Sequence, residues 1–255
     1  MSKDIFSEVP ELHYIEKAPA CDMDEFKKVI ESRRSVRVFT DEVIPDSVVE
    51  ECLNMALLAP NSSNLQPWEF YWVKSPEKLK TLQAYCLNQP AARTSQTLIA
   101  CVARPDRWKL GQKVNLAYFD TRPDTPRSVR AYYEKLVPFV YGNGPLHIFA
   151  PFKTLAVAIL GFFRVIPRGP FGASGNLLWA TKTTSLACEN LMLAFRAAGY
   201  DSCPMEGFDE VRVKKLLGLP RGAAVTMVVS AGKRASNGVY AERIRGAKDL
   251  FIKKV

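Results

Sequence analysis

The sequence predicts a domain of the α+β class. Segments rich in β-branched and aromatic residues at 69–73, 97–103 and 224–231 are typical of strands, and helical patterns lie between them. The chain has 255 residues, of which 47% are hydrophobic and 24% charged, so it can bury a sizeable core. We find no internal repeat and no low-complexity stretch.

Capping residues and prolines predict two helices in the first quarter of the chain. Asp22 and Glu25 form a capping-box pattern before a helix that we expect to end near Arg33–Arg34. Residues 35–39 alternate between polar and apolar side chains, which predicts extended chain. Pro45-Asp46 then opens a second helix, and Pro60 follows its end.

The next hundred residues combine clear elements with an irregular region. We expect a strand over 69–73, a helix over 75–85 and a short buried strand over 97–103. Prolines interrupt residues 104–150, so helical pieces are predicted only near 107–118 and 127–137.

The strongest helical pattern after residue 150 covers 181–198, with Gly199 as a suitable C-cap. This helix is apolar nearly all round, so it belongs in a core or an oligomer interface. A helix over 210–217 and a strand over 224–231 follow, and the tail after Gly232 is basic.

The charge pattern argues against nucleic acid. The formal net charge is +9, but lysines and arginines are scattered and no nucleic-acid motif is present. A phosphorylated cofactor or an acidic lipid surface explains part of this charge.

Cysteine and histidine usage predicts no metal site. Six cysteines include no Cys-x-x-Cys pair, and there are two histidines. We expect the thiols to be reduced and mostly buried, which predicts a cytoplasmic protein. The N-terminus has no apolar run, so we expect no signal peptide.

One apolar segment, 146–167, allows three interpretations. Its continuous apolar run, Leu155–Phe163, is far shorter than the roughly 20 residues of a membrane span, and Lys153 and Arg164 flank it. Burial in the core is favoured, followed by covering a pocket. Contact with a membrane surface is the least favoured of the three.

Two short motifs carry most of the functional information. Residues 33–37 read Arg-Arg-Ser-Val-Arg, and residues 60–68 read Pro-Asn-Ser-Ser-Asn-Leu-Gln-Pro-Trp. Together they suit a ligand with an anionic end, a hydroxylated middle and a flat polar ring, which is the anatomy of flavin mononucleotide (FMN). Taken singly, the first motif could be a solvated helix end and the second a helix-terminating turn.

The order of these motifs and of later ones resembles the FMN-dependent nitroreductase family. The later motifs are the 189–199 helix, the segment Ser-Cys-Pro-Met-Glu-Gly-Phe-Asp at 202–209 and a strand ending at Gly232. The likeness covers roughly 22–103 and 180–245. It implies a central, mainly antiparallel sheet flanked by helices, in an intertwined homodimer with FMN at the subunit interface.

The resemblance assigns roles to the arginine motif. Arg33, with Arg34 beside it, matches the position that holds the FMN phosphate, because a guanidinium binds phosphate in a bidentate way. Ser35 matches a hydroxyl that bonds the ribityl–phosphate region. Arg37 matches a cation near the N1–C2 edge of the flavin, where reduction gathers negative charge.

Other cofactor-binding positions follow from the same resemblance. The segment that lines the flavin ring corresponds to Asn61, Ser62, Ser63 and Asn64. Asn88 lies where an amide often reaches the pyrimidine edge. The loop on the opposite side of the ring corresponds to Pro204, Met205, Glu206 and Gly207.

The phosphate needs further cations, and two pairs compete. Arg243 and Arg245 follow Gly232 at a spacing similar to that of the family's basic pair, and they are favoured. Lys233 and Arg234 are the alternative pair.

The implied organisation is an arm over 1–21, one FMN-binding domain over 22–245 with a variable insert near 104–179, and a tail over 246–255. The implied activity is transfer of hydride from NAD(P)H to a nitroaromatic, quinone or related acceptor by a ping-pong mechanism. No side chain is nominated as a catalytic acid or base.

Two alternatives remain open. The same fold could serve other flavin chemistry, such as reductive dehalogenation, flavin breakdown or azoline oxidation. The chain could also be a non-catalytic flavin-binding or membrane-surface module.

Overall fold

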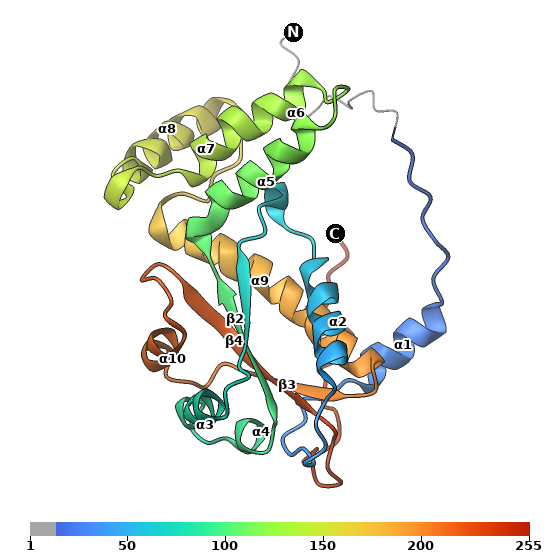
Figure 1. Ribbon diagram of the computed structural model, residues 1–255. Helices are drawn as coiled ribbons and strands as arrows, with labels where there is room; N and C mark the ends of the chain where they lie inside the picture. The colour runs from blue at the N-terminus through green and yellow to red at the C-terminus, as the bar shows by residue number, and fades with distance from the viewer. Residues whose placement is uncertain (1–13) are drawn as a thin grey trace.

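The computed structural model describes residues 14–255. A four-stranded sheet forms its centre, with strand order β1-β2-β4-β3 and every neighbouring pair antiparallel. The strands are β1 (Trp68–Trp72), β2 (Thr97–Ala103), β3 (Asp201–Met205) and β4 (Ala224–Gly232). Helices cover both faces of this sheet (Figure 1), so the predicted α+β class is confirmed.

The two faces of the sheet pack into two different apolar clusters. Leu98, Ala100 and Val102 of β2 pack toward α3 (Pro76–Tyr85), α4 (Pro90–Arg93) and α10 (Glu210–Leu217). Ile99 and Cys101 point to the other face, toward α2 (Asp46–Leu57) and α9 (Gly172–Ala197). Because both faces are covered, every residue of β2 is buried, as its continuous apolar run predicts.

The capping residues act as their positions predict. Asp22 accepts hydrogen bonds from the backbone of Asp24 and Glu25 at 2.8 and 3.1 Å, and α1 (Met23–Ser32) follows. Ser75 caps α3 in the same way through Lys78 N.

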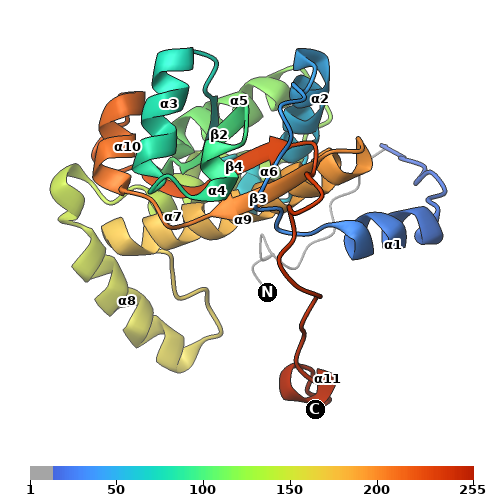
Figure 2. The ribbon, with the colours of Figure 1, turned by 90° about the horizontal axis from the view of Figure 1, so that it is seen from below.

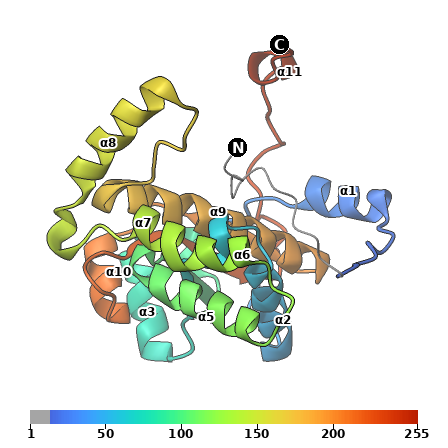
Figure 3. The same ribbon diagram turned by 90° about the horizontal axis from the view of Figure 1, so that it is seen from above.

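The predicted insert is largely helical. It holds α5 (Trp108–Asp120), α6 (Arg127–Ala131), a π-helical turn (Tyr132–Leu136), α7 (Val137–Tyr141) and α8 (Ala150–Phe163). Helices α5 to α8 gather at one end of the molecule, above the sheet in Figure 1, and α9 runs beneath them in Figure 3.

Two expectations about the insert and the helix after it were wrong. The helix expected over 181–198 begins earlier, at Gly172, because Trp179 and Ala180 pack into a third apolar cluster with Tyr141. The segment 146–167 is not buried in the core. Its helix α8 stands away from the body of the protein (Figure 2), and only Ala150 and Val157 of that helix are buried.

The C-terminal tail also leaves the body of the protein and ends in α11 (Lys248–Phe251), as Figure 2 shows. The expected N-terminal arm falls mostly outside the described residues. Its part from Tyr14 to Cys21 is exposed and forms neither helix nor strand.

Burial also determines the protonation of most cysteines among the described residues. All six are free thiols, and Cys21 is the exposed one. Burial raises the pKa of Cys52 to about 11 and that of Cys86 to about 12, so these thiols stay protonated near neutral pH.

Candidate functional site

The arginine motif lies where α1 ends and the chain becomes extended beside β3. Val36 N donates a 3.1 Å hydrogen bond to Ser202 O, and Ser35 forms a parallel bridge with Ser202. Val36 is fully buried, so its side chain anchors the motif in the core while its neighbours Ser35 and Arg37 turn outward.

The C-terminal tail closes over this motif and forms a pocket of about 300 Å³. Arg34 donates to Ala241 O, and Arg243 donates to Glu31 O at 2.9 Å and to Arg33 O. The pocket is lined by Arg33, Arg34, Ser35, Arg37 and residues 239–245. Six residues named from the sequence as cofactor ligands therefore share one pocket, although about 200 residues separate the two segments.

The pocket is strongly basic. Arg33, Arg34, Arg37, Arg243 and Arg245 line it, with Glu242 as its acidic residue. Arg33 Nη1 is buried and has no hydrogen-bond partner within the described part of the chain. A buried guanidinium nitrogen without an acceptor is costly in a protein on its own, so this position favours an anionic ligand.

The rival cations have other partners. Arg234 Nε donates to Asp201 Oδ2 at 3.1 Å, and Arg196 forms a 3.2 Å ion pair with the same carboxylate. Lys233 lies 5.8 Å from the centre of the Tyr200 ring. Neither Lys233 nor Arg234 lines the pocket, so the geometry favours Arg243 and Arg245.

The arginines also act on the adjoining strand. Burial raises the pKa of the Cys203 thiol, while the nearby Arg37 and Arg33 guanidiniums oppose that rise. Their positive potential therefore reaches β3, which leads directly into Glu206 and Gly207.

The segment 204–207 differs from the expected loop. Pro204 and Met205 belong to β3 and pair with Val229 and Val228 of β4, so only Glu206 and Gly207 are loop residues. Proline is tolerated here because β3 is an edge strand, where its missing N–H costs no ladder hydrogen bond.

The amide that contacts this loop is Gln89, the neighbour of Asn88, whose expected place at the pyrimidine edge of FMN stays a prediction. Gln89 Nε2 donates a 2.6 Å hydrogen bond to Gly207 O. Asn88 is exposed in a left-handed conformation with φ of 48°, and it lines none of the described pockets. The sequence offers two adjacent amides, and only the helix geometry before Pro90 shows which one turns toward residue 207.

The second motif lies elsewhere, in a short 3₁₀ turn (Ser62–Asn64) beside the insert. Ser63 Oγ and Tyr132 Oη are 2.6 Å apart, and Asn64 Nδ2 donates to Asn115 Oδ1 at 2.9 Å. Asn61 is satisfied within its own turn, since its Oδ1 accepts from Gln66 N at 2.9 Å. Ser63, Asn64 and Gln66 all have positive φ, so tertiary contacts hold this turn in a conformation that non-glycine residues rarely adopt.

A larger pocket of about 930 Å³ begins at this turn. Ser62 and Ser63 line one part of it, and the remainder is mainly aromatic and aliphatic side chains of α7, α8 and α9, with Arg168 and Lys182 as its cations. The arginine pocket and this pocket share no lining residue. One copy of the chain therefore does not bring the two sequence motifs to a common ligand.

Comparison with known proteins decides the family. The model of the nitroreductase family matches residues 30–233, which is most of the chain. The chain belongs to the nitroreductase family. The central sheet with its flanking helices is accordingly a nitroreductase-like fold.

Relatives and solved structures are similar over nearly the whole chain. The "4-nitrobenzoate reductase" of Pseudomonas putida is 27% identical over 221 residues, covering 84% of this chain and 87% of that protein. The "NADH dehydrogenase" of Thermus thermophilus is 27% identical and covers 83% and 88%. A structure described as a nitroreductase from Exiguobacterium sibiricum in complex with FMN has a TM-score of 0.67 at 24% identity and covers 94% and 100%.

Proposed function

We propose that this family member is an FMN-dependent oxidoreductase that accepts hydride from NAD(P)H and reduces nitroaromatic, quinone or related acceptors in a ping-pong cycle. The observation that carries the proposal is the arginine pocket, with its buried and unpaired Arg33 Nη1. Relatives named for reduction of 4-nitrobenzoate and for NADH dehydrogenation support the reaction class.

The residues of the pocket fit the phosphate of FMN. Arg33 offers an unused nitrogen, and Arg243 and Arg245 add positive charge from the tail. Arg243 already donates to the carbonyls at the end of α1, which fixes its guanidinium and leaves further N–H groups for a ligand. Ser35 supplies a hydroxyl between these cations and Arg37.

Beyond the phosphate, the protein supplies orientation and electrostatics. When bound, FMN provides the hydride chemistry. Arg37 lines the same pocket, where it would stabilise negative charge that develops on reduction. Gln89 donates a hydrogen bond to the Gly207 carbonyl and so helps to fix the 206–207 backbone. The described side chains nominate no acid or base for the reaction.

A second copy of the chain would complete the site. Asn61, Ser62, Ser63 and Asn64, proposed to line the flavin ring, do not line the arginine pocket of their own copy. In a homodimer the turn of one copy would meet the arginine pocket of the other. The exposed Leu178 and Leu186 of α9 give this proposed interface an apolar surface.

The larger pocket is suited to the acceptor. Its volume of about 930 Å³ exceeds what a single-ring nitroaromatic fills, and Tyr132, Tyr141 and Trp179 give it flat apolar walls. Because it begins at Ser62 and Ser63, an acceptor bound there would lie beside the ring that these residues are proposed to line.

Substitution of Arg33 tests the proposal. Arg33→Gln removes a charge-assisted bidentate ligand, so FMN affinity should fall about 10-fold to 100-fold. The measurement is titration of apoprotein by quenching of free-flavin fluorescence, followed by NADPH-dependent turnover of a nitroaromatic and of a quinone.

The matched control is Arg127→Gln. Arg127 is exposed on α6, away from both pockets, so this variant should bind FMN like the parent protein. Equal FMN affinity in both variants would remove Arg33 from the cofactor site. Lack of FMN binding by the parent protein would overturn the proposed function.

A further inference from the structure

The helix α8 carries its large apolar side chains on the side that faces away from the protein. Phe152, Leu155, Ile159 and Phe162 recur at helical spacing, and each is between 56% and 85% exposed. We call these four residues the outer stripe.

The opposite face of α8 carries mostly smaller residues. Ala150 and Val157 are buried, and Thr154 and Val157 line the large pocket together with Leu160, which is 51% exposed. A helix that only packs on its own protein has the reverse arrangement, with its largest apolar side chains inward. The inner face therefore accounts for the contact of α8 with the protein, and the outer stripe serves something outside it.

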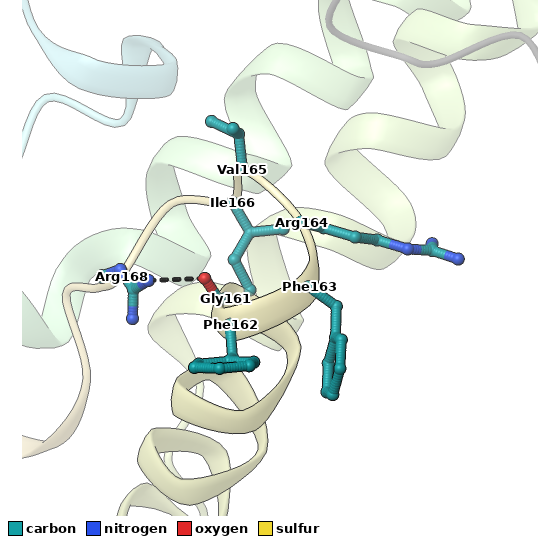
Figure 4. A pocket seen from close by; sticks show the side chains of 7 residues that line it. All are labelled: Gly161, Phe162, Phe163, Arg164, Val165, Ile166 and Arg168. Atoms are coloured by element: carbon teal, nitrogen blue, oxygen red, sulfur yellow. Dashed lines mark hydrogen bonds between the residues drawn. The ribbon is translucent and has the colours of Figure 1, made fainter.

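The apolar surface continues past the end of the helix. Phe163 is 77% exposed and Val165 is fully exposed. Figure 4 shows the Phe162 and Phe163 rings on the same side of the helix end, with Arg164 extending away from them. Arg168 lines an open hollow of about 350 Å³ here and donates to Gly161 O at 2.7 Å. Exposed aromatic residues beside arginine are typical of segments that enter a lipid interface.

The chain on both sides of α8 carries charges of one sign. The sequence contains no aspartate or glutamate between Glu134 and Glu189, while Arg164 and Arg168 are exposed next to the apolar surface. The whole chain carries a net charge of +9, so an anionic bilayer is attracted to this surface.

We propose that α8 is an interfacial helix that rests the protein on an anionic lipid bilayer, with the outer stripe at the acyl boundary and Arg164 among the headgroup phosphates. The helix has 14 residues, whereas a span needs about 20, so it lies on the bilayer. Among residues 14–255, no helix has both the length and the apolar character needed to cross a membrane. This surface is separate from the arginine pocket and does not depend on the flavin chemistry.

Co-sedimentation of the full chain with lipid vesicles tests this inference. The vesicles are phosphatidylcholine alone or with about 30% phosphatidylglycerol. The protein should pellet with the anionic vesicles, and less so as salt rises from about 0.1 to about 0.5 M, because salt screens the arginines. If the protein fails to pellet with the anionic vesicles, the proposal is wrong.

The triple variant Phe152→Ser/Leu155→Ser/Ile159→Ser tests the outer stripe directly. None of these residues lines a described pocket, and affinity for anionic vesicles should fall at least about 10-fold. The control Val211→Ser removes an equally exposed apolar side chain from α10 and should pellet like the parent protein. Equal pelleting of the triple variant and the control would overturn the proposal.

Two further measurements distinguish a lipid bilayer from a second copy of the chain as the partner of the outer stripe. Arg164→Gln, which leaves the stripe intact, should weaken binding to anionic vesicles about fivefold, whereas Lys80→Gln on α3 should not. Light scattering reports the oligomeric state of each variant. If the parent protein does not bind vesicles and the triple variant forms a smaller oligomer than the parent, the outer stripe is a contact between copies. That result would contradict the lipid assignment.

Discussion

At the scale of single residues, the arginines near the end of α1 form two groups, one paired with a carboxylate and one lining the basic pocket. Arg196 and Arg234 share the carboxylate of Asp201, which is only 4% exposed. Among residues 14–255, Arg33 and Arg37 form no ion pair with a carboxylate, and both line the basic pocket. Buried charges are stable when paired, so the first group stabilises the fold while the second remains available to an anion.

Substitution of the shared carboxylate should therefore destabilise the fold. Asp201→Asn leaves two partly buried guanidiniums without their anion, which should cost about 2–3 kcal/mol and lower the melting temperature by about 5–10 °C. Differential scanning calorimetry measures this. Asp124→Asn, at an exposed position, is the control and should melt like the parent protein. An unchanged melting temperature for Asp201→Asn would mean that the pairing does not stabilise the fold.

At the scale of elements, packing of α5 against the second motif controls the shape of the 62–64 turn. Asn115 of α5 donates to Asn64 O at 2.8 Å, and Gly111 lies directly against the backbone of Leu65. A Cβ atom at Gly111 would lie 2.2 Å from Leu65 O. The close approach of α5 therefore depends on glycine at this position.

Gly111→Ala should then destabilise the protein, although alanine is the better helix former. The intrinsic helix preference favours alanine by about 1 kcal/mol, but the clash with backbone should cost more and shift the Ser62–Asn64 turn. Thermal unfolding and FMN content of the purified variant measure both effects. Gly222→Ala, where the added methyl meets nothing within 4 Å, is the matched control. A Gly111→Ala protein as stable as that control would contradict this packing argument.

How far the sequence predicts these elements depends on whether the deciding interactions are local. The caps of α1 and α3 and the apolar run of β2 are local, and the structure has these elements within one or two residues of the expected bounds. The start of α9 and the exposure of α8 depend on which distant segments pack nearby, and here the expectations were wrong. The contact of Gln89 with Gly207 likewise depends on the direction in which one turn presents its side chains.

In the candidate site, too, some features could be predicted from the sequence and others depend on the fold. The arginine motif and the Arg243–Arg245 tail could be named from residue type and order, and they meet in one pocket. The separation of the 60–68 motif from that pocket could not be predicted from one sequence, because it follows from the path of α2 and β1 through the fold. Assignment of these residues to FMN remains a prediction.

At the scale of the whole molecule, three parts leave the compact body. These are α8, the tail that ends in α11, and the stretch before α1 (Figures 2 and 3). The tail adds Arg243 and Arg245 to the arginine pocket, and the inner face of α8 lines the larger pocket. Projecting segments of this kind suit a protein whose site is completed by a second copy and whose outer helix meets a different surface.

The central claim is that this chain binds FMN and reduces it with NAD(P)H. An absorbance spectrum of the purified protein, followed by anaerobic addition of NADPH and then NADH, tests it most directly. The account predicts a yellow protein with a flavin band that bleaches on addition of at least one of the two donors and returns when a nitroaromatic or quinone is added. A colourless protein that takes up no FMN, or a flavin band that neither donor bleaches, would contradict the account.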